Sequence, residues 1–152
     1  MANDSTSTTP TGYVNGSDML LMLDELCIGH CMSHKIQYDT DTKTHNVKAP
    51  ASVKDIGTDL FSEETVTGQS FKIEFEGLQH YEETENSIGK LRMAWKAGKP
   101  VTAKCFRRAK DDTPYLVGPV VITSLTEDHP GRDDSTFSGS LKNSGAPTVM
   151  TE

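Results

Sequence analysis

The sequence has little apolar material and no long apolar run. Only 34% of its 152 residues are hydrophobic, and the longest uninterrupted apolar stretch is Met19–Leu23. A helix that spans a bilayer needs about 20 such residues, so we expect no membrane-spanning segment. The N-terminus lacks a basic region followed by an apolar core, so we expect no secretory signal and a protein made and kept in a cytoplasm.

Cysteine is also scarce, and its odd count of three predicts reduced, buried thiols. Cys27, His30, Cys31 and His34 are residue types that bind zinc. In an extended strand, however, Cys27 and Cys31 lie roughly 13 Å apart, too far for one ion or for a disulfide. A loop around Gly29 would bring them closer, so zinc stays a minor alternative. We predict no metal and no cofactor.

Recognisable catalytic patterns are missing as well. The chain has no Gly-x-Ser-x-Gly elbow and no glycine-rich phosphate loop. Its carboxylate pairs, such as Glu63 and Glu64, are adjacent residues that point to opposite faces of a strand. The formal charge of −7 and a pI near 5.2 disfavour specific binding of nucleic acid. We therefore predict that the protein is neither an enzyme nor a specific nucleic-acid-binding protein.

Apolar alternation, by contrast, runs through much of the chain and predicts a β-rich fold. It is clearest where Phe71, Ile73 and Phe75 alternate with charged residues. Strands are expected over residues 19–23, 28–38, 65–78, 101–107, 115–125 and 135–141. One helix is expected over residues 86–97, anchored in the core by Ile88, Leu91 and Trp95 at helical spacing. The sequence predicts a β-sandwich or barrel of six or seven strands, with a flanking helix between the fourth and fifth.

The remaining segments are polar. Residues 1–17 are expected to form a flexible N-terminal arm and residues 148–152 a short tail, around one domain at 18–147. Residues 39–64 lack a sustained period, and a loop of that length is usually functional or disordered. The chain closes with a predicted hairpin of Val120–Leu125 and Ser135–Leu141, joined by an acidic turn. Pro119 predicts an edge or bulge within its strand.

The order of several motifs resembles the tail tube proteins of tailed bacteriophages, particularly the major tail proteins of long-tailed, siphophage-like particles. The resemblance covers about residues 15–147 and includes a long loop after the second strand. Its motifs are N-G-x-D-M-L-L-x-L, V-T-G-x-S-F-x-I-x-F-E-G-L, L-x-x-A-W-K-A-G-K-P-V, Y-L-x-G-x-x-V-I-T-S-L and D-D-x-T-F-S-G-S-L-x-N-S-G.

This resemblance implies a virion structural protein without catalytic activity, made in the host bacterium and located in the virion tail. Six subunits would close a homohexameric ring, and stacked rings would form a hollow tube for DNA ejection. Tape measure, tail terminator and distal tail proteins would be partners, and DNA would pass without specific binding. A tube of a contractile injection or secretion system is the nearest alternative. A small, monomeric ligand-binding β-barrel is an alternative of another class.

The resemblance also suggests where contacts occur. Strands 65–78 and 132–141 are expected to face the lumen, and their carboxylates would keep DNA from adhering. The lumen candidates are Glu74, Glu76, Asp133 and Asp134. The N-terminal arm at 1–17 and the loop at 39–64 are expected to contact adjacent rings. The inter-ring candidates are Asp39, Lys43, Val47, Val53, Ile56, Leu60 and Phe61.

Overall fold

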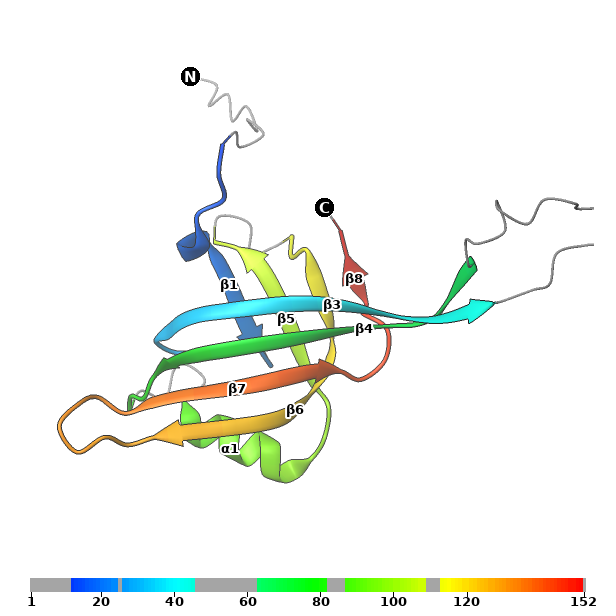
Figure 1. Ribbon diagram of the computed structural model, residues 1–152. Coiled ribbons are helices and arrows are strands. Elements are labelled where there is room, and N and C mark those ends of the chain that lie inside the picture. The colour runs from blue at the N-terminus through cyan, green and yellow to red at the C-terminus, as the bar shows by residue number, and fades with distance from the viewer. Residues whose placement is uncertain (1–11, 25, 46–62, 82–86, 109–112, 152) are drawn as a thin grey trace, which may run out of the picture.

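The computed structural model describes residues 12–24, 26–45, 63–81, 87–108 and 113–151. They form one eight-stranded antiparallel sheet and one α-helix (Figure 1). The elements are β1 (Met19–Leu23), β2 (Leu26–Cys27), β3 (Cys31–His45), β4 (Glu63–Leu78), α1 (Ile88–Ala97), β5 (Val101–Arg107), β6 (Leu116–Asp128), β7 (Thr136–Asn143) and β8 (Val149–Met150). The mainly β fold is confirmed, and the helix follows the fourth strand as predicted.

The sheet folds over into two layers, and β6 belongs to both of them. The sheet order is β2-β1-β5-β6-β7-β4-β3, and β8 also pairs with β6. β6 pairs with β5 up to Val120 and with β7 from Val120 onward. Pro119 immediately precedes this change of partner, and a register shift follows between Ile122 and Ser124. Figure 1 shows the result: β3, β4, β7 and β6 lie side by side, and β1 and β5 cross behind them.

The core lies between the layers and follows the alternation of the sequence. Its fully buried side chains include Ile73 of β4, Leu116 of β6, and Phe137 and Leu141 of β7. The rings of Phe75 and Phe137 meet edge to face, with centroids 6.1 Å apart. A Cβ added at Gly139 would come within 2.7 Å of the Phe75 ring. This glycine is therefore required for close packing, as its place within a strand suggests.

The helix confirms two of its three predicted anchors. Ile88 and Leu91 are buried, with 8% and 2% of their surface exposed. Trp95 is 55% exposed, so its prediction as a core anchor is wrong. It lies one turn beyond Leu91, near the end of α1, where Gly98 adopts a left-handed conformation and the chain turns away. There the indole lines an open cleft beside β6 and is not covered by the sheet.

Several predicted boundaries also change. The strand expected from Ile28 is interrupted by a turn in which His30 has a φ of 51°, so β3 begins at Cys31. Both ends of the expected loop at 39–64 are strands, because Asp39–His45 of β3 pairs with Glu63–Ser70 of β4. The C-terminal tail contributes β8, which pairs with the start of β6.

Candidate assembly surfaces

One side of the four-stranded layer, formed by β3, β4, β7 and the later part of β6, is largely polar, and its apolar residues are Leu78 beside Thr136 and Val121 beside Lys142. Cross-strand partners share a side of a sheet, and the register joins Ser33 to Glu76, Glu76 to Ser138 and Ser138 to Thr126. We call this side the polar face. Its polar members are Ser33, Lys35, Gln37, Asp39, Ser70, Lys72, Glu74, Glu76, Ser124, Thr126, Asp128, Thr136, Ser138, Ser140 and Lys142.

The charges of the polar face nearly cancel. It carries three lysines and four carboxylates, which gives a net charge of −1. Lys72 Nζ lies 2.8 Å from Glu74 Oε1, and this pair lowers the pKa of Glu74 and raises the pKa of Lys72. The Ser33 hydroxyl donates a hydrogen bond of 3.0 Å to Glu76. Seven of its fifteen polar side chains carry hydroxyls, so the face is well hydrated and weakly anionic.

The structure separates the four predicted lumen residues into two pairs. Glu74 and Glu76 lie on the polar face and are exposed. Asp133 and Asp134 lie in the turn between β6 and β7, beyond the end of that face. The two strand segments predicted to face one surface are direct neighbours, since Lys72–Leu78 pairs with residues 136–142.

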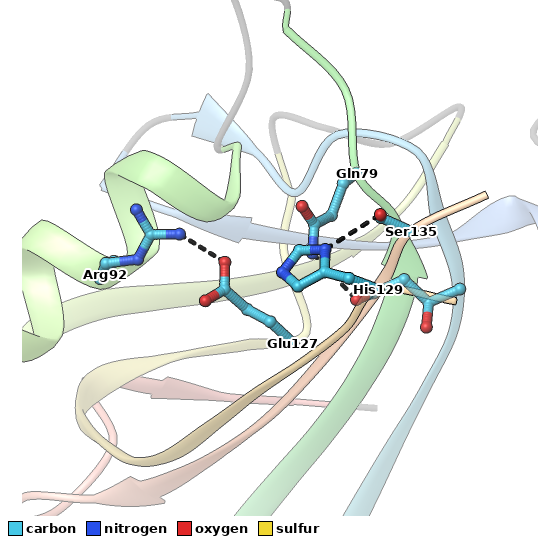
Figure 2. A network of polar contacts seen from close by, with 6 residues as sticks. Gln79, Arg92, Glu127, His129 and Ser135 are labelled. Atoms are coloured by element: carbon cyan, nitrogen blue, oxygen red, sulfur yellow. Dashed lines mark hydrogen bonds and ion pairs between the residues drawn. The ribbon is translucent and has the colours of Figure 1, made fainter. Parts of the chain in front are cut away.

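Polar contacts fix the base of this acidic turn (Figure 2). The backbone N–H of Gln79 donates to the Ser135 carbonyl at 2.9 Å, and its side chain donates to the Thr136 carbonyl at 3.0 Å. Nδ1 of His129 lies 3.0 Å from the Ser135 hydroxyl, across the turn. Arg92 of α1 forms an ion pair with Glu127. The turn therefore projects from a base that is tied to β4 and to the helix.

The four-stranded layer has an open edge on each side. Within the described chain, β3 pairs with β4 alone, and β6 beyond Val120 pairs only with β7. Three antiparallel pairings separate these edges, so β3 and β6 run in opposite directions. Unpaired strand edges readily pair with another chain. No local pattern in the sequence shows which strands are edges.

The far ends of β3 and β4 form a two-stranded arm, defined as Asp39–His45 and Glu63–Ser70. Figure 1 shows the arm leaving the body of the molecule. Almost all of its residues are exposed, including Val66 at 57%. Asp39 and Lys43 lie on this arm, whereas Val47, Val53, Ile56, Leu60 and Phe61 lie outside the described residues. A two-stranded ribbon is marginally stable alone, which suggests a role for the arm in contacts between copies.

Groups of three or more metal-binding side chains are absent from the part of the chain that the structure describes. In the same residues, no helix has the length and hydropathy of a membrane span. All three cysteines are thiols. Cys105 is completely buried as predicted, whereas Cys27 and Cys31 are only half-buried, so the prediction of burial was wrong for these two.

The reactivity of the Cys105 thiol tests whether this residue is buried in the core. Burial raises the pKa of its thiol to about 12, and a hydrogen bond with Tyr115 acts in the opposite direction. Alkylation requires the thiolate, and an ordinary thiol has a pKa of about 8.5. At pH 8.5 we expect Cys105 to react with iodoacetamide at least ~1,000-fold more slowly than after unfolding in urea. Peptide mass spectrometry measures this rate, and similar labelling in both states would contradict the buried position.

Comparison with solved structures identifies the fold. The chain superposes on the tail of an empty gene transfer agent particle determined with C6 symmetry, with a TM-score of 0.73, 16% identity, and coverage of 91% of this chain and 100% of that one. For the SPP1 tail tube the TM-score is 0.61, with 10% identity and coverage of 92% and 81%.

A contractile system has the same architecture. The sheath–tube complex of the extracellular contractile injection system PVC matches with a TM-score of 0.54, 15% identity, and coverage of 96% of this chain and 99% of that one. No protein-family model matches the sequence, and no curated protein is detectably similar to it. The chain therefore has the fold of tail tube proteins, as its motif order suggested.

Proposed function

We propose that this protein is a structural, non-catalytic subunit of the tail tube of a phage-like particle. The observation that carries the proposal is the four-stranded layer, which combines a largely polar face with two open edges. The fold shared with tail tubes supports the same function. In this account the molecule acts through self-association, and its location is the virion tail.

Strand direction makes this layer suitable for a ring. Since β3 and β6 run oppositely, β3 of one copy can continue the antiparallel sheet of the next copy by lying beside its Val121–Asp128 segment. A contact between two different edges is heterologous, and such contacts close into rings when the rotation allows it. The C6 symmetry of the similar gene transfer agent tail supports six subunits per ring.

In the closed ring the polar face would line the lumen, because the apolar side of the layer packs on the core of each subunit. DNA adheres to surfaces that release its counterions through lysine and arginine. Here Lys72 is paired with Glu74, and the face carries one more carboxylate than lysine. We assign Glu74 and Glu76 to the lumen wall and Asp133 and Asp134 to the rim of the ring. DNA from the capsid would pass without binding.

Stacking of the rings would use the arm and the segment that follows it. The exposed ribbon carries Asp39 and Lys43 away from the body, and the apolar residues Val47, Val53, Ile56, Leu60 and Phe61 follow in the sequence. Together with residues 1–17 they would contact adjacent rings. Tape measure, tail terminator and distal tail proteins would be further partners of the tube. The subunit itself would be made in the host bacterium.

The likeness to the PVC complex favours a second candidate, the tube of a contractile system. Both candidates require rings and tubes, so electron microscopy of the purified full chain tests the shared claim. We expect rings with sixfold symmetry, or hollow tubes, as the protein concentration rises. A dispersed monomer at every concentration, also in the presence of tail extracts from the source particle, would contradict the proposal.

A further inference from the structure

A partly open groove runs along the core side of the β3 edge. It has a volume of about 770 Å³, enough for a large side chain, and its walls include Leu20, Ile28, Ile36, Tyr38 and Tyr115. Ile36 is half-buried, and 58% of the surface of Tyr38 is exposed. The sandwich is thus not closed on this side, and we call this feature the β3 groove.

A half-exposed indole lies at the opposite edge of the layer. Trp95 of α1 is 55% exposed and lines a cleft with Ile88, Thr123 and Leu125. An aromatic side chain of this size gains considerable free energy when a partner covers it. The helix therefore presents an incomplete apolar contact beside the open edge of β6.

The groove and Trp95 lie on the same side of the four-stranded layer. Ile36 pairs with Ile73, which is buried and lies on the side opposite to the polar face. On that same side, Glu127 of β6 forms its ion pair with Arg92 of α1. When β3 of one copy lies beside β6 of the next, the groove of the first and the helix of the second meet behind the joined strands.

The two features also lie at a similar level along the strands. One row of register partners runs across the layer from Ser124 through Ser140 and Glu74 to Lys35. The adjacent row of partners connects Leu125 to His34 in the same way. Trp95 lines the cleft at Thr123–Leu125, so its position along the strand direction matches that of the β3 residues that border the groove. Buried indole N–H groups need an acceptor, and the groove offers Tyr38, Tyr115 and His34 side chains.

We propose that the β3 groove of each copy receives Trp95 of the next copy, and that this contact locks the ring behind its strand pairing. The occupant of the groove is thus a second copy of this chain. The inference rests on the proposed function, because it uses the edge pairing of the ring. It adds a specific apolar contact between copies, which neither the strand pairing at the edges nor the polar lining of the lumen requires.

The first test uses fluorescence, since Trp95 is the only tryptophan of the chain. On assembly of the full chain, we expect its emission maximum to move to shorter wavelength. We also expect quenching by acrylamide to fall at least about threefold, because the indole leaves water. An indole that stays equally accessible in assembled particles would overturn the proposal.

The second test compares Trp95→Ala with Met93→Ala. Both side chains are exposed on α1, at 55% and 64%, so neither change should unfold the subunit. They lie about 200° apart around the helix, so only Trp95 faces β6. Interface aromatics are often dominant contributors to affinity. We expect Trp95→Ala to raise the concentration needed for half-maximal assembly at least about tenfold, and Met93→Ala to change it less than about twofold.

The outcomes separate the two claims. If the natural sequence forms neither rings nor tubes, the proposed function fails. If it assembles and Trp95→Ala assembles at the same concentration, the docking proposal fails and the proposed function stands. A Tyr38→Ala variant tests the proposed contact independently, from the groove side. Its effect should not add to that of Trp95→Ala, since the two changes remove one contact.

Discussion

Replacement of residues 46–62 by Asn-Gly is expected to leave single rings and to abolish long tubes. His45 and Glu63 are register partners at the end of the arm, so a two-residue turn can join them. The body of the subunit and both edges of the four-stranded layer remain unchanged. The proposed stacking contacts of Val47, Val53, Ile56, Leu60 and Phe61 are lost. Negative-stain microscopy should show rings without filaments.

A matched control keeps the length of the segment and removes its side chains. A glycine–serine linker over the same residues should also prevent stacking, because the apolar contacts are missing even though the reach is retained. Circular dichroism should show unchanged strand content in both variants. Normal tubes from both variants would show that stacking uses other surfaces and would contradict the role assigned to residues 46–62.

Replacement of Phe137 by Ala is expected to lower the free energy of unfolding by about 3–5 kcal/mol, as for other buried aromatics. Phe137 is 2% exposed, packs edge to face on Phe75, and lies against Gly77. A domain of ordinary stability has only about 5–15 kcal/mol in total. Urea denaturation of the dispersed subunit measures the loss, and assembly should fail at temperatures where the variant is partly unfolded.

An exposed aromatic supplies the control for this measurement. Tyr81 is fully exposed and follows the end of β4. Tyr81→Ala should change the free energy of unfolding by less than about 0.5 kcal/mol. A loss below about 1 kcal/mol for Phe137→Ala would show that the two layers do not pack on this ring, and the sandwich described above would be wrong.

Local patterns in the sequence predicted the parts of the fold that local chemistry determines. The alternation of Phe71, Ile73 and Phe75 placed the buried side of β4 correctly. The predicted end of the helix at residue 97 is correct, and Gly98 adopts the left-handed conformation typical of a residue after a helix. The closing hairpin of β6 and β7 followed from two strand patterns around an acidic turn.

Long-range contacts determined the parts that sequence reasoning missed. Trp95 has the same helical spacing as Ile88 and Leu91, but the spacing does not show where the covering sheet ends. The ribbon at Asp39–His45 lacks an apolar period because both its sides are exposed, and pairing with β4 alone makes it a strand. Polar residues on β3 became part of a surface only when the register placed them beside β4 and β7.

The central claim is that the polar face lines a continuous tube, and a helical reconstruction of tubes assembled from the full chain tests it most directly. The account predicts that β6, β7, β4 and β3 of every copy surround the axis, with Glu74, Glu76 and Ser138 pointing into the lumen and β3 paired to β6 of the next copy. A lumen lined by β1 and β5, with the polar face turned outward, would contradict it.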